Sequence, residues 1–184
     1  MPKIIKTLFL ATVLFTEPIS KASFMVVVFY FVGALIFGSL IEYWVHRSMH
    51  KLHMVGKAHH KHHHSNTGQG VIWEFLQYAG GVSIFMCPIF LISIQAGLIW
   101  SMGILVYAAF SAYSHQLQHE NPSLCFWTKT HYIHHKYNME QHNFGLAMDV
   151  WDRVFGTYKQ YKLVESLEEE LLQPEKGYFD IKWW

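Results

Sequence analysis

Two long stretches without a charged side chain constrain the fold of this chain more than any other feature. The first covers residues 22–41, and the second, about twice as long, covers residues 75–114. A helix needs about 20 apolar residues to cross the hydrocarbon core of a bilayer. The first stretch therefore has the length of one membrane-spanning helix and the second the length of two. We expect Gln95, Ala96 and Gly97, a polar and flexible break near the middle of the second stretch, to form the turn of a helical hairpin.

These stretches predict an all-α fold, an integral membrane bundle of about four helices with a cytoplasmic, histidine-rich helical cap. Runs rich in Phe, Val and Ile, such as residues 25–31, have strand propensity, but their length and lack of turn residues favour helices in lipid. The expected elements are a helix at about 4–16, a helix at 22–50, a histidine-rich segment at 51–70, a helical hairpin at 73–119, and a polar portion at 120–184 that includes an amphipathic surface helix at 164–173. Gly33, Gly38, Gly80, Gly81 and Gly103 predict close contacts between helices.

Basic residues predict the orientation of the bundle. One set follows the second expected crossing and another follows the fourth: Arg47, Lys51, Lys57 and Lys61, and Lys129, Lys136, Arg153 and Lys159. Because basic residues favour the cytoplasmic side, both sets are expected on that face. The first 16 residues resemble the start of a signal peptide, but no small-x-small cleavage site follows. We expect a short span or an interfacial helix there instead.

Charge and cysteine content exclude two classes of protein. The net charge is +1 with histidine neutral, and no Lys/Arg tract free of histidine occurs, so nothing favours nucleic acid as a partner. Cys87 lies in an apolar run and Cys125 in a loop among aromatic residues. Neither their number nor their spacing suggests a disulfide framework or a Cys-ligated zinc site. We expect both to be buried free thiols.

The histidines have a regular spacing. All 14 lie between residues 45 and 143. His46 and His50 are four residues apart, as are His115 and His119, so on a helix each pair shares a face with Cβ atoms about 6 Å apart. Two further sets follow the pattern His-x-x-His-His, which places their members on adjacent helical turns: His59, His62 and His63, and His131, His134 and His135.

Imidazole binds iron, zinc, copper and nickel, and an all-nitrogen ligand set without Cys argues against iron–sulfur or blue-copper chemistry. The ten histidines of the four motifs exceed what one ion can use. Two ions that share ten imidazoles have about five each and keep a position open for oxygen or water. We therefore expect two metal ions, with ligands from two separated parts of the chain.

The order of the four motifs resembles the histidine boxes of the fatty acid hydroxylase and sterol desaturase superfamily. The resemblance continues through residues 143–145, Asn-Phe-Gly, and residues 151–157, Trp-Asp-Arg-Val-Phe-Gly-Thr, which are similar to the closing signature of that superfamily. It covers roughly residues 42–158, and the joint pattern is far more specific than one box alone. It implies a single domain at 1–184, with a catalytic region at about 42–158 and a C-terminal tail at 159–184.

The resemblance also implies an O2-dependent oxidoreductase that hydroxylates or desaturates an unactivated C–H site of a membrane lipid, such as a fatty acyl chain, sphingoid base, sterol or carotenoid. The implied cofactors are two iron ions, which zinc could replace in a purified sample, together with O2. Because no haem-binding electron donor is visible in the chain, a separate electron-transfer protein is implied. The site would face the cytoplasm from a bacterial inner membrane or from the endoplasmic reticulum.

Several residues near the motifs have open roles. His60 and His64 create a competing register, His60-x-x-His63-His64, and the spacing from His50 favours His59, His62 and His63 only slightly. His53 and His142 are additional candidates, either as ligands or as hydrogen-bond donors that support ligands. Glu42 and Asp152 could each orient a ligating imidazole through its second nitrogen. A helix cap or a salt bridge, for instance between Asp152 and Arg153, is an equally good explanation for these carboxylates.

A histidine-rich membrane metal transporter or metal-binding protein is the alternative function. The tract at residues 59–64 would suit a metal-scavenging loop. Such a loop does not explain paired histidines at the ends of two different spans. A transporter is also expected to carry ionisable groups within the membrane, and neither uncharged stretch has them. The spacing therefore favours the enzyme.

Overall fold

The computed structural model describes residues 21–160 and 177–184. The helices expected at about 4–16 and 164–173 lie outside the described residues. Within them the fold is helical and contains no strand, which confirms the all-α prediction. The elements are α2 (Lys21–Met49), α3 (His53–Ser65), α4 (Val71–Val82), the 3₁₀ helices η1 (Ser83–Phe85) and η2 (Cys87–Leu91), α5 (Ile94–Glu120), η3 (Pro122–Leu124), α6 (Thr130–Lys136) and α7 (Val150–Val154).

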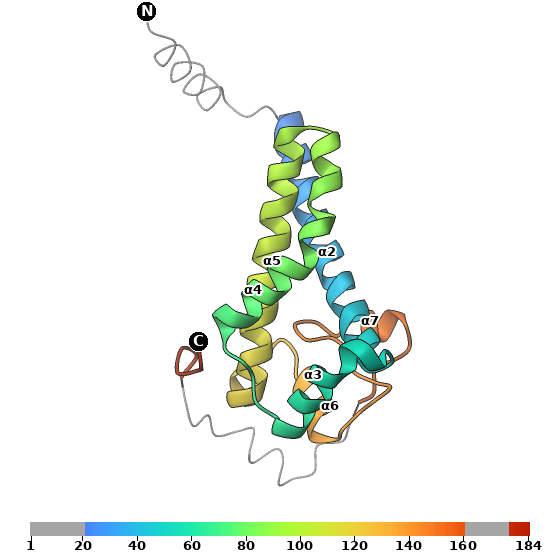
Figure 1. Ribbon diagram of the computed structural model, residues 1–184. Helices are drawn as coiled ribbons and strands as arrows, with labels where there is room; N and C mark the ends of the chain where they lie inside the picture. The colour runs from blue at the N-terminus through green and yellow to red at the C-terminus, as the bar shows by residue number, and fades with distance from the viewer. Residues whose placement is uncertain (1–20, 161–176) are drawn as a thin grey trace, which may run out of the picture.

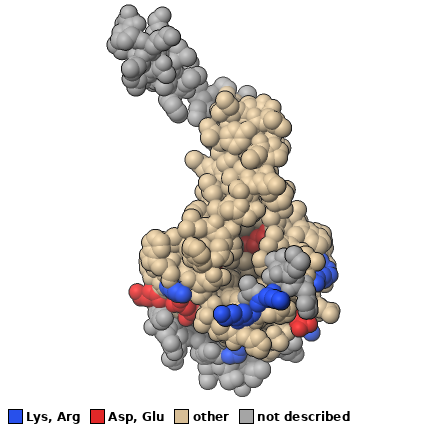
Figure 2. Space-filling model, viewed as in Figure 1, with Lys and Arg blue, Asp and Glu red and all other residues tan. Residues whose placement is uncertain are grey.

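Helices α2, α4 and α5 form a long stalk, and α3, α6 and α7 gather at one end of it (Figure 1). Among the described residues, two helices are long and apolar enough to cross a membrane, Ser23–Met49 and Ile94–Glu120. Their outer surface is apolar, since side chains such as Phe29 and Ile94 are 73% and 74% exposed. In Figure 2 the charged side chains gather at the end that carries α3 and α6, while the visible face of the stalk has almost none. An uncharged, outward-facing apolar surface is what a helix in lipid presents.

The turn of the hairpin lies a few residues before the predicted position. Ser93 has an extended backbone, and its Oγ accepts a hydrogen bond from Ala96 N at 3.0 Å, so Ser93 caps the start of α5. Gln95 to Gly97 therefore form the first turn of α5 and not the loop. Gly97 faces the ring of Phe90, and a Cβ at this position would lie 2.4 Å from that ring. The glycine marks a close contact between η2 and the start of α5.

Other predictions for the stalk hold only in part. Gly103 lies at the crossing of α5 and α2, where a Cβ would come within 2.7 Å of the Ala34 Cβ. Gly80 and Gly81 have no neighbour within 4 Å of a built Cβ, so the prediction of a helix contact there is wrong. Cys125 is buried as expected, but Cys87 is exposed, because it lies on the outer apolar surface of the stalk.

Residues 177–184 pack against the start of α4 and the end of α5. Ile181 is 6% exposed and lies in a core cluster with Val71, Ala112, Leu117 and Cys125. The backbone N–H groups of Val71 and Ile72 donate to the carbonyls of Lys182 and Trp183, at 3.1 and 2.9 Å. The first N–H groups of a helix have no partner within the helix. This segment therefore provides acceptors for two of the N–H groups at the start of α4.

Candidate metal centre

The ten histidines of the four sequence motifs converge at the end of the stalk. The pair His46 and His50 comes from the end of α2, and the pair His115 and His119 from the end of α5. The two His-x-x-His-His motifs lie on α3 and α6, which pack between these ends (Figure 1). Helical spacing aligns the members of each motif, and the packing of the four helices then brings the motifs together.

One group of imidazoles is formed by α2, α3 and α6. Its members offer ring nitrogens that all lie within 4.8 Å of one another: His46, His50, His59, His63 and His134. The Nε2 atoms of His50 and His59 are 2.8 Å apart, and the Nε2 atom of His134 lies 3.0 Å from that of His50. This geometry fits a single ion at the centre of the group.

A second group is formed by α3, α5 and α6. His62, His119, His131 and His135 offer nitrogens within 4.8 Å of one another. Nε2 of His115 lies 3.2 Å from Nε2 of His62 and 3.3 Å from Nε2 of His119, so this residue adjoins the same group. The two groups are in contact, because the rings of His63 and His135 stack with centroids 4.0 Å apart.

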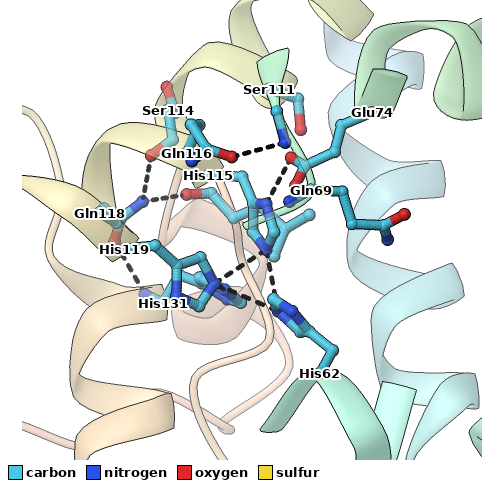
Figure 3. A network of polar contacts seen from close by, with 12 residues as sticks. His62, Gln69, Glu74, Ser111, Ser114, His115, Gln116, Gln118, His119 and His131 are labelled. Carbon is cyan, nitrogen blue, oxygen red and sulfur yellow. Dashed lines mark hydrogen bonds and ion pairs between the residues drawn. The ribbon is translucent and has the colours of Figure 1, made fainter. Parts of the chain in front are cut away.

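Hydrogen bonds from the Nδ1 atoms of two rings in the second group show where a ring proton lies. Nδ1 of His62 donates to the carbonyl of Thr67 at 3.0 Å, and Nδ1 of His115 lies 2.5 Å from Oε2 of Glu74 (Figure 3). A carbonyl or carboxylate oxygen accepts, so each Nδ1 carries a proton, and in the neutral ring each Nε2 carries a lone pair. Those two Nε2 atoms nevertheless face each other at 3.2 Å. Facing lone pairs repel unless a cation lies between them.

The first group has the same arrangement. Nδ1 of His46 donates to the carbonyl of Phe144 at 2.5 Å, and Nδ1 of His134 donates to the carbonyl of His142 at 2.7 Å. Among the described residues, Nε2 of His46 and both ring nitrogens of His135 are buried without a hydrogen-bond partner. A buried polar atom without a partner costs about 1–3 kcal/mol. A metal ion in each group would satisfy Nε2 of His46 and one ring nitrogen of His135, so the residues present fit two ions.

Burial keeps the imidazoles of His50, His59, His63 and His134 neutral, which metal binding requires. Burial, followed by neighbouring imidazoles, lowers the pKa of His63 to about 3 and that of His59 to about 2. Burial likewise lowers the pKa of His134 to about 3. Removal from water disfavours the charged form of a histidine, and a second positive charge nearby disfavours it further. At neutral pH these rings therefore offer lone pairs.

His60, His64 and His142 lie outside both groups. His60 and His64 are exposed on α3. The backbone of His53 begins α3. His142 provides the carbonyl that His134 contacts, and its own Nδ1 donates to the carbonyl of Thr157 at 3.2 Å. The fold thus brings together His59, His62 and His63 in preference to the competing register.

Glu42 has a different position from the one suggested by its spacing to His46. Its carboxylate accepts hydrogen bonds from Tyr107 at 3.0 Å, from Ser111 at 2.5 Å and from the Leu146 N–H at 2.8 Å. These contacts are to hydroxyl and amide groups and not to an imidazole. Glu42 therefore joins α2 to α5 and to the loop that follows α6.

Asp152 acts on the histidines through the backbone. Its two oxygens accept from the N–H groups of Phe144 and Gly145, at 2.8 and 2.7 Å, and from the Thr157 hydroxyl at 2.7 Å. The loop that these bonds hold presents the Phe144 carbonyl to His46. The suggested ion pair with Arg153 is not formed, because Arg153 pairs with Asp149 at 2.7 Å.

Glu74 is the carboxylate that contacts an imidazole, and the sequence reasoning missed it. It is 1% exposed on the first turn of α4, and its Oε1 also accepts from the Gln69 N–H at 2.7 Å. The spacing from Glu74 to His115 has no helical meaning, since 41 residues separate them. One signal was present: Glu74 is the single acidic residue between Glu42 and Glu120.

An apolar cavity of about 350 Å³ lies between α2, α4 and α5 and ends at the histidines. Its walls include Ile41, Val82, Phe85 and Ile104, and His46, His62 and His115 are among the histidines that line it. Tyr107 is buried and also lines this cavity. The cavity therefore connects the inner surface of the stalk with both groups of imidazoles.

Comparisons with known proteins are consistent with this geometry. The family model described as fatty acid hydroxylase matches residues 31–157. The chain is 25% identical over 159 residues to the very-long-chain aldehyde decarbonylase CER1 of Arabidopsis thaliana, covering 77% of this chain and 25% of that protein. It is 25% identical over 147 residues to the fatty acid 2-hydroxylase of Rattus norvegicus, covering 69% of this chain and 40% of that protein. No solved structure matches the chain significantly.

The chain thus spans less than half the length of these curated relatives. The two apolar helices, together with these relatives, support a membrane protein. The family match covers more than half of the chain and contains all ten converging histidines. This extent confirms the resemblance seen in the motifs: the chain belongs to the fatty acid hydroxylase family, within the fatty acid hydroxylase and sterol desaturase superfamily.

Proposed function

We propose that this chain is a membrane-bound, non-haem dimetal oxygenase that hydroxylates or desaturates an unactivated C–H site of a lipid. One observation carries the proposal, namely that an apolar cavity between the stalk helices ends at two adjoining groups of imidazoles. Membership of the fatty acid hydroxylase family supports the same chemistry. The substrate is a fatty acyl, sphingoid, sterol or carotenoid lipid.

In this proposal each group of histidines holds one iron ion. The ligands of the first ion are His46, His50, His59, His63 and His134, and those of the second are His62, His115, His119, His131 and His135. Five neutral ligands leave a position open on each ion. Iron in such a site supplies the activation of O2 when it is bound. The electrons come from a separate electron-transfer protein.

The residues of the chain bind and orient the reactants. The apolar walls of the cavity take up the hydrocarbon part of the lipid and exclude water from it. The bonds from Nδ1 atoms to Glu74 and to the carbonyls of Thr67, Phe144 and His142 fix the direction of four ligating rings. Hydroxylation balances as RH + O2 + 2 e⁻ + 2 H⁺ → ROH + H2O. Desaturation consumes the same O2, electrons and protons and releases two molecules of water.

The same proposal includes an orientation in the membrane. In the expected bundle of about four helices, α2, α5 and the hairpin arm of α4, η1 and η2 are three of the membrane crossings. The histidine-rich end faces the cytoplasm, because the basic residues that follow the crossings favour that side. A lipid would then enter the cavity sideways from the bilayer. The membrane is a bacterial inner membrane or the endoplasmic reticulum.

Labelled oxygen tests the proposal. Lipid extracts are compared from cells that carry the intact chain, His134→Ala or His64→Ala, grown under ¹⁸O2. We expect the intact chain and His64→Ala, whose altered side chain is exposed, to yield the same new lipid, and His134→Ala to yield none. A hydroxylated product carries ¹⁸O, whereas a desaturated product is lighter by two hydrogens. If the three extracts match while cellular metal content differs, the protein handles metal and is not an oxygenase.

A further inference from the structure

Residues 177–184 form a defined structure beside the metal centre. The carbonyl of Tyr178 accepts from the hydroxyl of Tyr113 at 3.0 Å, and the indole of Trp183 donates to the carbonyl of Phe179 at 3.1 Å. Ile181 is buried in the core cluster, whereas Phe179 is 76% exposed. This segment, which we call the strap, is therefore anchored by one buried side chain and by backbone hydrogen bonds.

The strap fixes the start of α4. Its carbonyls at Lys182 and Trp183 accept the first N–H groups of the helix, those of Val71 and Ile72. Gly70, which precedes the helix, has a φ of 115°, a conformation that residues with a Cβ rarely adopt. A Cβ on Gly70 would lie 2.7 Å from the backbone of Trp184. The close approach of the strap to α4 thus requires glycine at this position.

A second route joins the strap to α5. Oε1 of Glu120 accepts from the Lys182 N–H at 3.0 Å and from Nε2 of Gln116 at 2.5 Å. Oε1 of Gln116 in turn accepts from the Gly70 N–H at 2.9 Å (Figure 3 shows Gln116 beside His115). Gln116 and Glu120 directly follow His115 and His119 in the sequence. Both routes therefore reach the second group of imidazoles.

We propose that the strap positions His115 in the metal centre, through the start of α4 with its Glu74 carboxylate and through Gln116 and Glu120 of α5. Glu74 lies on the first turn of α4, and this turn is held by the strap. The Oε2 atom of Glu74 contacts Nδ1 of His115. Movement of the α4 start would move the acceptor away from the ring. The inference rests on the proposed dimetal centre, and it assigns the strap to the second ion only.

The test compares two substitutions by aspartate in the strap. Ile181→Asp places a charge in the core cluster and releases the strap, whereas Phe179→Asp changes an exposed side chain of the same segment. Two readouts are taken on the full chain in detergent. Amide hydrogen exchange at Val71 and Ile72 reports strap docking without metal. Titration with Co²⁺, followed by its absorption spectrum, reports the affinity and geometry of the two sites separately.

We expect Ile181→Asp to speed exchange at Val71 and Ile72 and to weaken the second Co²⁺ site by about 10–100-fold, the range found when a partner of a metal ligand is lost. The first site and the Phe179→Asp chain should behave like the parent. If Ile181→Asp does not fold, Glu120→Ala provides the same test, because it removes the acceptor shared by Lys182 and Gln116. Glu120→Gln, which keeps a carbonyl oxygen there, should restore binding.

Three results would overturn the inference. Fast exchange at Val71 and Ile72 with both Co²⁺ sites unchanged would show that the strap does not act on His115. Equal weakening of both sites, together with a lower melting temperature, would show a general structural role. Absence of Co²⁺ binding in the parent chain would refute the dimetal centre itself. This result would be seen in the first titration, before any variant is made.

Discussion

Nδ1 of His115 lies 2.5 Å from Oε2 of Glu74, although 41 residues separate the two in the sequence. Both side chains are buried, at 6% and 1% exposure. The contact places a ring proton on Nδ1 and directs Nε2 toward His62 and His119. The orientation of this ring therefore depends on a residue of another helix.

Substitution of Glu74 is expected to weaken metal binding. Glu74→Ala removes the acceptor of His115, so the affinity for the second ion should fall about 10–100-fold, and Glu74→Gln should have a smaller effect. Competition with a coloured chelator measures the affinity. Asp149→Asn, which removes an exposed ion pair with Arg153, is the control and should bind metal normally. Unchanged affinity in Glu74→Ala would show that the contact has no role in binding.

Metal content distinguishes the two histidine registers on α3. His59→Ala and His63→Ala each remove a nitrogen from the first group, so each should contain about one ion fewer per chain than the parent. His60→Ala and His64→Ala change exposed side chains and should keep the parent content. Elemental analysis of the purified proteins measures the number of metal ions per chain. Loss of metal in His60→Ala or His64→Ala would establish the other register.

Asp152 is expected to affect both stability and the first metal site. Asp152→Ala leaves the N–H groups of Phe144 and Gly145 and the Thr157 hydroxyl without their acceptor. Each buried group left unpaired costs about 1–3 kcal/mol, so the melting temperature should fall clearly. The Phe144 carbonyl would also lose its fixed position against His46, so binding at the first site should weaken. A variant with normal melting and normal metal content would contradict this role.

Filling the cavity should block lipid turnover without loss of metal. Gly81 lines the cavity, and a Cβ there meets no atom within 4 Å, so Gly81→Leu places a side chain in the open space. Gly80 also has no neighbour within that distance, and it is outside the cavity lining, so Gly80→Leu is the matched control. We expect Gly81→Leu to lower product formation at least tenfold and Gly80→Leu to leave it near normal. Equal activity of the two variants would place the lipid elsewhere.

Acid is expected to destabilise the metal-free protein. Burial lowers the pKa of His50 and His62 to about 4, from 6.5 for a free histidine. Between about pH 6.5 and 4 the unfolded chain binds protons that the folded chain does not, so the free energy of unfolding decreases as the pH falls through this range. Above pH 7 these residues should not make the free energy of unfolding depend on pH. Thermal melts in detergent with a chelator, from pH 8 to pH 5, measure the effect, and a flat profile would contradict it.

Local sequence patterns were sufficient to predict the long helices α2 and α5 and to recognise the four histidine motifs. The helix expected at 22–50 agrees with α2 (Lys21–Met49) nearly to its ends, although the uncharged stretch within it ends at residue 41. The spacings of four residues and of His-x-x-His-His placed imidazoles on common faces, because helical geometry is local. The turn before α5 was displaced, since the capping hydroxyl of Ser93 determined where the helix begins.

The sequence by itself determined that this chain is helical, has two long uncharged apolar stretches and is rich in imidazoles at helical spacing. Only the tertiary structure decided which groups meet: Glu74 with His115, the Phe144 carbonyl with His46, and Ile181 with the core beside α4. The physical reason is the distance along the chain over which each kind of interaction acts. Periodicity and capping act within one or two helical turns, whereas these contacts join residues far apart in the chain and depend on how whole helices pack.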